Sequence, residues 1–275
     1  LLASASDDDS IRIRDGLTHK LLRTISADSD GVVAIAFSPD EKTLISGGWD
    51  GTVKIWSLPK GTLKKTLEGH EENITCVAIS PDGKQIASGS GDDSLRLWDV
   101  ASGEEIFAAE LDDEYDFTAA VFAPDGKQIV TGDGEGHIRI WDTEAGDELM
   151  TISAHEGSVT SLALSKEVFV SGGREGLLKS WTLSAQHERT FRGHADEVTA
   201  VTLGCRGSRI VSASDDGSLR VWDSGNGRVI WTRQSPGKIG LNAVAVSPDG
   251  TQLVAGCGKS VLVWPMRPCP SPPLK

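Results

Sequence analysis

Three sets of residues in this sequence combine a histidine, a serine and an acidic side chain, the residue types that nucleophilic catalysis uses. The sets are His70, Ser88 and Asp92; His155, Ser171 and Glu175; and His194, Ser212 and Asp216. Each set is followed by a tryptophan, and these are Trp98, Trp181 and Trp222. Catalysis would also need an exposed serine and an oxyanion hole. A set copied along the chain and capped by tryptophan is expected to belong to a scaffold, so we predict no catalytic residue and no enzyme activity.

Short β-strands are the elements that must position these residues. Between Gly69 and Asp99 the sequence has three runs with alternating apolar residues, at 74–80, 86–90 and 95–99. A Pro81-Asp82-Gly83 turn separates the first two runs, and a Gly91-Asp92-Asp93 corner separates the last two. This pattern predicts three antiparallel strands joined by tight hairpins. It lacks the 3.6-residue period of an amphipathic helix.

The same pattern recurs along the whole chain. The tryptophans that close the third strand are Trp56, Trp98, Trp141, Trp181, Trp222 and Trp264. Successive members of this series are 40 to 43 residues apart. A period of about 40–45 residues with four strands per unit is typical of the blades of a β-propeller.

The repeated motifs resemble the WD40-repeat family over essentially residues 1–264, with Gly69-His70 opening a unit and Trp98-Asp99 closing its third strand. We therefore expect an all-β, seven-bladed β-propeller of four-stranded antiparallel blades. The first blade should lack its inner strand, and the last should lack its outer strand. We expect one propeller domain over 1–264 and a Pro-rich extended tail over 265–275. We also expect the chain to be part of a longer protein whose flanking residues complete the ring.

The resemblance also implies a structural role for the three sets named above. In this family the acid, histidine, serine and tryptophan form a hydrogen-bond chain that ends on the indole N–H. Such a chain satisfies buried polar groups that would otherwise cost ~1–3 kcal/mol each. Units two, four and seven depart from the Gly-His pattern, with Ala27-Asp28, Asp112-Asp113 and Gly237 at that place. Those blades should be softer at the loop end.

Composition restricts the partners. The net charge of −13 argues against a surface that binds the phosphates of nucleic acid or an anionic membrane. No apolar run approaches the ~18 residues that span a bilayer, and His19, His137 and His187 lack the spacing of metal ligands. We therefore expect no metal, no cofactor and no small-molecule substrate.

Four cysteines without a C-x-x-C pair indicate a reducing, intracellular compartment, whether cytoplasmic, cytoskeletal or nuclear.

Acidic residues gather in two kinds of loop that share one face of a propeller in this family, called the top. The loops before the inner strands contribute Asp28, Asp30, Glu71, Glu72, Asp112, Asp113, Glu114, Asp116, Glu156, Asp196 and Glu197. The corners between second and third strands contribute Asp9, Asp93, Asp133, Glu175 and Asp215. These residues are either ordinary turn residues in solvent or a negative face that steers a basic segment of a partner.

Candidate contact residues lie on the same face. Trp49 and Arg174 precede their corner acids, and Tyr115 lies in the acidic loop of unit four. The resemblance points further side chains at the central opening, namely Thr75, Thr118, Thr160, Thr199 and Asn242, with Val33 at the same place in unit two. The predicted partner-binding set comprises these residues except Val33, together with Asp112, Asp113, Glu114 and Asp116.

The sequence thus predicts a non-enzymatic scaffold or adaptor that presents an acidic top face to a basic protein or peptide within a larger protein or complex. The alternative is an architectural propeller in a large assembly, for example a cytoskeletal or axonemal one. That alternative would use the blade edges or the bottom turns Pro39-Asp40, Pro81-Asp82, Pro124-Asp125 and Pro248-Asp249.

Overall fold

The computed structural model describes residues 1–27, 30–111, 115–166, 168–182, 184 and 186–266. The described residues form seven antiparallel sheets, which are the blades of a β-propeller and are numbered here in chain order. Within these ranges the strands are accompanied by two short 3₁₀ turns, η1 (Cys205–Gly207) and η2 (Pro236–Lys238). The chain divides into two compact units, Leu1–Ala154 and His155–Lys275.

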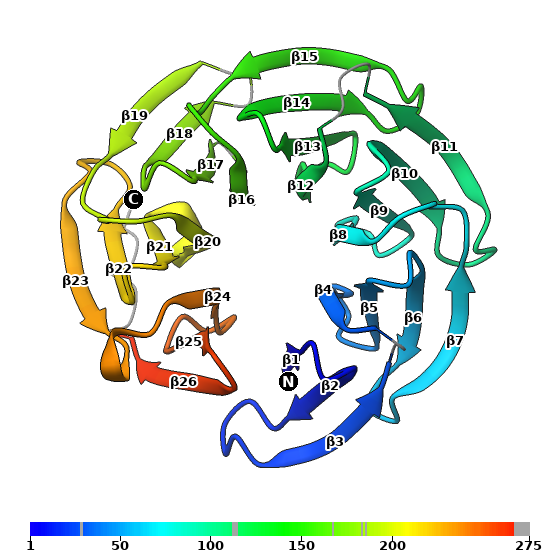
Figure 1. The fold of residues 1–275 in the computed structure, drawn as a ribbon, viewed down its shortest axis with the longest axis horizontal. Helices are drawn as coiled ribbons and strands as arrows, with labels where there is room; N and C mark the ends of the chain where they lie inside the picture. Colours follow the sequence, from blue (N-terminus) through cyan, green and yellow to red (C-terminus); the bar gives the residue numbers. More distant parts are fainter. Residues whose placement is uncertain (28–29, 112–114, 167, 183, 185, 267–275) are drawn as a thin grey trace, which may run out of the picture. The chain divides into compact units, whose positions relative to one another are not determined.

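The unit Leu1–Ala154 contains blades 1 to 4 (Figure 1). Blade 1 has β1 (Leu2–Ala5), β2 (Ser10–Arg14) and β3 (Leu21–Ser26). Blade 2 has β4 (Val32–Phe37), β5 (Thr43–Gly48), β6 (Val53–Ser57) and β7 (Thr62–Leu67). Blade 3 has β8 (Ile74–Ile79), β9 (Gln85–Ser90), β10 (Ser94–Asp99) and β11 (Glu105–Glu110). Blade 4 has β12 (Phe117–Phe122), β13 (Gln128–Asp133), β14 (His137–Asp142) and β15 (Glu148–Ser153).

The unit His155–Lys275 contains blades 5 to 7. Blade 5 has β16 (Val159–Leu164), β17 (Val168–Gly173), β18 (Leu178–Thr182) and β19 (His187–Phe191). Blade 6 has β20 (Val198–Gly204), β21 (Arg209–Ser214), β22 (Ser218–Asp223) and β23 (Val229–Gln234). Blade 7 has β24 (Leu241–Val246), β25 (Gln252–Cys257) and β26 (Ser260–Pro265).

The turns between the first two strands of a blade show how the local sequence sets the hairpins. In blade 3 the Ser80 hydroxyl donates to Asp82 Oδ1 at 2.6 Å and accepts the Gln85 N–H at 2.9 Å. Gly83 takes a φ of +73°, which favours glycine. The turn therefore closes on itself and fixes the register in which Ile79 faces Ile86.

Bulges occur at fixed places in these strands. In blades 2 to 7 the inner strand skips one residue of register directly after its first residue, as between Ile74 and Cys76. The skipped residues are Val33, Thr75, Thr118, Thr160, Thr199 and Asn242. The outer strands of blades 1 to 6 have a second bulge, which lies close to the start of each outer strand, as at Ile106 in β11.

The hydrophobic core lies between successive blades within each unit. One cluster joins Leu95 and Leu97 of blade 3 to Phe117 and Trp141 of blade 4. Another joins the strands of blade 5 to Trp222 of blade 6. Each of these tryptophans thus packs against the blade before its own, so a blade is completed by its neighbour.

The predicted seven-bladed fold class is confirmed. Blade 1 comprises the three strands after the missing inner strand, and blade 7 lacks an outer strand. β26 includes Pro265, one residue beyond the predicted end of the propeller, and Met266 packs on the core cluster that blades 6 and 7 share. The rest of the predicted tail, 267–275, lies outside the described residues.

The cysteines only partly follow the expectation of separate, reduced thiols. Cys76 and Cys257 are free and buried, whereas Cys205 is disulfide-bonded. Burial raises the pKa of the Cys76 thiol to about 11, so this thiol is unreactive at neutral pH. Among the described residues, no helix has the length and apolar character needed to cross a membrane.

Candidate functional site

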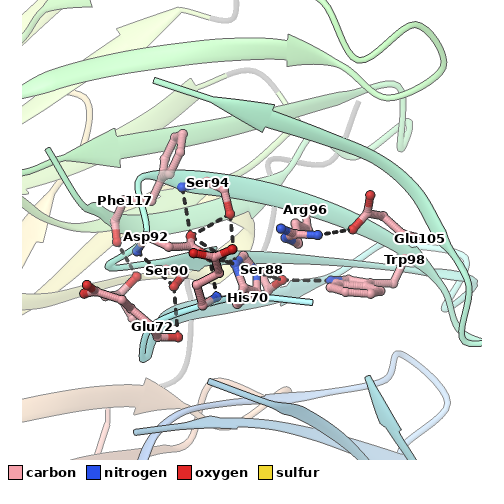
Figure 2. A network of polar contacts seen from close by, with 12 residues as sticks. His70, Glu72, Ser88, Ser90, Asp92, Ser94, Arg96, Trp98, Glu105 and Phe117 are labelled. Atoms are coloured by element: carbon pink, nitrogen blue, oxygen red, sulfur yellow. Dashed lines mark hydrogen bonds and ion pairs between the residues drawn. The ribbon is translucent and has the colours of Figure 1, made fainter. Parts of the chain in front are cut away.

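The set in blade 3 forms a continuous polar chain, drawn in Figure 2. His70 Nδ1 lies 3.0 Å from Asp92 Oδ2, and His70 Nε2 lies 2.8 Å from the Ser88 hydroxyl. The indole N–H of Trp98 donates to the same hydroxyl at 2.8 Å. Asp92 also accepts the backbone N–H of Glu71 at 2.8 Å, so the chain ties the loop before β8 to the corner between β9 and β10.

Blades 5 and 6 contain the same chain. In blade 6, His194 bonds Asp216 at 3.2 Å and Ser212 at 2.7 Å, and Trp222 donates to Ser212 at 2.9 Å. In blade 5 the same three contacts measure 2.6, 2.7 and 3.0 Å, and the acid is a glutamate. Burial lowers the pKa of all three histidines, although the neighbouring carboxylates act in the opposite direction.

These chains are unsuited to nucleophilic catalysis. Ser88, Ser171 and Ser212 have no exposed surface, and each hydroxyl is engaged by both an imidazole and an indole. A nucleophile must reach a substrate carbonyl, and these oxygens do not reach the surface. The arrangement instead satisfies polar groups inside the blade and fixes the loop above it.

Steric crowding explains why a glycine precedes the histidine in blades 3 and 6. A β-carbon at Gly69 would lie 3.0 Å from both Arg96 Nη1 and the Trp98 ring. At Gly193 it would lie 2.6 Å from Arg220 Nη1, and Arg220 lies over the Trp222 ring, 5.8 Å from its centroid. The arginine and the tryptophan therefore cover the glycine and leave no room for a side chain.

Blade 4 has a different polar network that sequence reasoning missed. Asp133 was predicted as an acid of the top face, but its exposed fraction is 1% and it pairs with the buried Arg139. Asp133 also accepts the backbone N–H groups of Glu135 and His137 at 3.0 and 2.9 Å. Trp141 still donates to Thr131 at 2.8 Å. The sequence did contain a signal for this network. Asp133 stands where blade 3 has Ser90, and it precedes Arg139 by six residues.

Glu175 was also predicted among the acids of the top face, but its main contact is inside the blade. Its side chain is 17% exposed and bonds His155. A negative surface built from the corners of the blades is therefore smaller than the sequence indicated, since Asp133 and Glu175 contribute little to it.

The threonines expected at the central opening are half-buried, and the hydroxyls of Thr75, Thr160 and Thr199 bond to backbone. The Thr75 hydroxyl donates to the carbonyl of Phe117, which is in the next blade. Thr160 donates to Val198, and Thr199 donates to Leu241. Thr118 occupies the same bulge and is also half-buried. The bulge thus turns these hydroxyls toward the neighbouring inner strand. Their hydrogen bonds therefore help to join one blade to the next.

Trp49 is the most exposed aromatic side chain among the predicted contact residues of Leu1–Ala154, with an exposed fraction of 56%. Tyr115 is 37% exposed, and Asp116 is exposed beside it. Asp28 and the predicted contact residues Asp112, Asp113 and Glu114 lie outside the described residues.

In the unit His155–Lys275, Arg174 is exposed and pairs with Glu197 at 3.7 Å. Burial raises the pKa of Glu197, although Arg174 acts in the opposite direction. Asn242 is exposed at the start of β24, and its amide oxygen occupies the space that a β-carbon at Gly256 would need. Among the described residues, no group of three or more His, Cys, Asp or Glu side chains is placed to hold a metal ion.

The repeats match the family profile described as "WD domain, G-beta repeat" over more than half of the chain. The matched residues are 19–57, 61–99, 112–142, 146–182, 185–223 and 229–265. The chain therefore belongs to the WD40-repeat family. Most matches begin with the outer strand of one blade and end with the third strand of the next, as 19–57 runs from β3 to β6.

Curated relatives resemble parts of this chain. It is 33% identical over 101 residues to the small ribosomal subunit protein RACK1 of Caenorhabditis elegans, covering 36% of this chain and 30% of the relative. It is 33% identical over 117 residues to the pre-mRNA-splicing factor cwf17 of Schizosaccharomyces pombe, covering 41% and 34%. It is 29% identical over 104 residues to THO complex subunit 6 of Arabidopsis thaliana, covering 36% and 28%. The matched part thus spans about a third of each relative.

Proposed function

We propose that this protein is a non-enzymatic interaction scaffold that binds a basic segment of a partner protein through the surface around Trp49. The single observation that carries the proposal is an indole that is 56% exposed and has acidic loops of the neighbouring blades close to its turn. An exposed tryptophan is the kind of side chain that anchors an interface. The surrounding carboxylates would favour and orient a cationic partner.

The acids around Trp49 come from three blades of Leu1–Ala154. A β-carbon at Gly31 would lie 3.1 Å from Trp49 Cδ1 and 3.3 Å from the Cα of Asp7, so the indole and the corner of blade 1 flank the same glycine. Gly51, two residues after Trp49, lies against the loop before β8, since a β-carbon at Gly51 would lie 2.8 Å from the carbonyl oxygen of Glu72. Asp7, Asp30, Glu71 and Glu72 are all exposed. We call Trp49 and these four acids the Trp49 patch.

The contact candidates further along the chain extend this proposal without being needed for it. Tyr115 and Asp116 belong to blade 4, whereas Arg174, Thr199 and Asn242 belong to the unit His155–Lys275. The relatives named above are a ribosomal protein, a splicing factor and a THO complex subunit. By analogy we place this protein inside the cell, as a member of a larger complex.

Selection of peptides from a random display library tests the proposal. Wild-type protein would be the bait, and the variant Trp49→Ala would remove peptides that do not need the indole. We expect the enriched peptides to carry lysine or arginine beside an apolar residue, and to bind more weakly as salt is raised. Leu17→Ala is the matched control, because Leu17 is 77% exposed but lies in the turn between β2 and β3. Enrichment of neutral or acidic peptides, or equal binding by Trp49→Ala, would count against the proposal.

Two observations favour the architectural alternative. A hollow of about 260 Å³ lies between the bottom turns of blades 3 and 4, lined by Pro81 and Asp82 on one side and Pro124 and Asp125 on the other. The outer strands of Leu1–Ala154 also expose apolar side chains, among them Leu63 and Ile106. Cross-linking to a partner at these residues, with the Trp49 patch left uncovered, would support this alternative.

A further inference from the structure

The outer strands of Leu1–Ala154 carry apolar side chains that are about half exposed. The exposed fractions are 51% for Leu22, 51% for Leu63, 44% for Ile106 and 51% for Leu149. Leu22, Ile106 and Leu149 stand at the bulges of β3, β11 and β15. Packing inside the blade does not require an apolar residue at this place, since the same bulge in β7 holds the exposed Lys64. These side chains are therefore available to a partner.

Charge on this outer surface is separated into two halves. In residues 20–26 and 60–67, which contain β3 and β7, every charged side chain is basic. In residues 104–110 and 144–153, which contain β11 and β15, every charged side chain is acidic. Among them Lys60, Lys64, Glu104 and Glu110 are exposed. One surface thus has a basic half and an acidic half, with apolar side chains in both.

The two halves meet between β7 and β11, which follow one another around the outer rim in Figure 1. Lys65 of β7 donates to the backbone carbonyl of Ala101, in the turn that leads to β11. A β-carbon at Gly103 in the same turn would lie 3.1 Å from the Lys65 side chain and 3.2 Å from that of Leu67. β7 therefore packs directly against the turn that leads into β11, and this contact fixes the border between the halves.

We propose that a second copy of this chain binds across this border, with β7 of each copy against β11 of the other. A twofold axis between the two strands brings each basic strand onto the acidic strand of the other copy. Leu63 and Ile106 would meet near the axis, and Lys60 and Lys64 would face Glu104 and Glu110. This inference goes beyond the proposed function and does not depend on it, because none of these residues belongs to the Trp49 patch.

The size of the surface sets the strength of the contact. A strand of six residues is roughly 20 Å long, so two neighbouring strands offer less than the ~800 Å² per partner of a standard interface. We therefore expect a weak dimer that forms reversibly as concentration rises. Because exposed charges contribute, the dimer should weaken as salt is added.

Charge exchange provides the decisive test, measured by sedimentation equilibrium of the whole chain. One variant carries Lys60→Glu and Lys64→Glu, and the other carries Glu104→Lys and Glu110→Lys. Each should dimerise at least ~10-fold more weakly than wild type, since each presents like charges to itself. An equimolar mixture should dimerise again, because every contact between the two variants is then complementary.

Matched substitutions of apolar residues distinguish this contact from non-specific hydrophobic association. Ile106→Ser should weaken dimerisation, whereas Leu149→Ser, at the same bulge in β15, should not. Circular dichroism would verify that all variants are folded. The inference is overturned if wild type stays monomeric at every concentration, or if dimerisation is unchanged in the charge variants. Failure of the mixed variants to associate would overturn it too.

Discussion

Gly173 and Glu175 depend on each other in blade 5. A β-carbon at Gly173 would overlap both Glu175 Oε2 and His155 Nδ1. Blades 3 and 6 have the shorter aspartate as the acid, and in both blades a serine stands where blade 5 has this glycine, at Ser90 and Ser214. The longer side chain of Glu175 therefore requires a glycine at position 173, and the two differences from blades 3 and 6 belong together.

This relationship predicts a rescue. Gly173→Ser should destabilise the protein by ~1–3 kcal/mol, because the new side chain collides with the buried pair. Adding Glu175→Asp should recover most of that loss, since blade 6 accommodates Ser214 with Asp216. Urea denaturation of the two single variants and the double variant gives the coupling energy. A double variant no more stable than Gly173→Ser would contradict the account.

The polar chain in blade 3 should contribute to stability through its serine. Ser88→Ala leaves the imidazole of His70 and the indole of Trp98 without their shared partner, so we expect a loss of ~1–3 kcal/mol in the free energy of unfolding. Ser102→Ala is a suitable control, because Ser102 is exposed in a turn and bonds only locally. Equal losses for the two variants would mean that the buried chain is not the cause.

Stability should fall in two stages as the pH is lowered. The folded pKa values of His70, His155 and His194 lie below the ordinary value of 6.5, so the unfolded chain binds protons first as the pH falls through about 6.5. The stability that these histidines contribute is therefore present above pH 6.5 and is lost below it.

The second stage belongs to the carboxylates. Burial acts to raise the pKa of Asp92 and Asp216, but hydrogen bonds from Ser94 and Ser218 and the other donors outweigh it and lower both values to about 2. Their contribution is present above the unfolded value of 3.8 and is lost toward pH 2. Urea midpoints measured from pH 8 to acid would check both stages, and His194→Asn should reduce the first. A midpoint that is constant between pH 7 and 5 would rule out the histidine stage.

The bulge of β4 offers a stabilising substitution. Val33 is 41% exposed at the place where Thr75, Thr160 and Thr199 donate to the next blade. Val33→Thr should place a hydroxyl toward the carbonyl of Ile74 and stabilise the protein by ~0.5–1.5 kcal/mol. The reverse change Thr75→Val should destabilise it by a similar amount. Thermal unfolding of both variants would test the pair, and a shift of the same sign in both would refute the inter-blade role.

The sequence predicted the strands well because their signals are local. A Ser-Pro-Asp-Gly turn closes with bonds inside the turn, such as Ser80 to Asp82, so it can be identified without knowing the neighbours. The polar chains were predictable for a different reason. The three complete sets keep their spacing relative to the tryptophan, and the family resemblance supplied the meaning of that spacing.

What the sequence missed depends on contacts that the strand pattern does not specify. Asp133 was expected in an exposed corner of blade 4, but it is buried, because Arg139 lies close enough to pair with it. The hydroxyl of Thr75 was expected to face an opening, and its bond to Phe117 across 42 positions follows only from the packing of two inner strands.

The matched repeats are offset from the blades, so the boundary of a repeat falls inside a sheet. A nick in the turn Ser102–Gly103, for instance, would cut the chain near the border of a repeat and yet divide a sheet, because β11 pairs with β10. The two fragments would then be joined across that sheet by hydrogen bonds and side-chain packing alone, which makes this turn a natural place to attempt reassembly of the protein from two pieces.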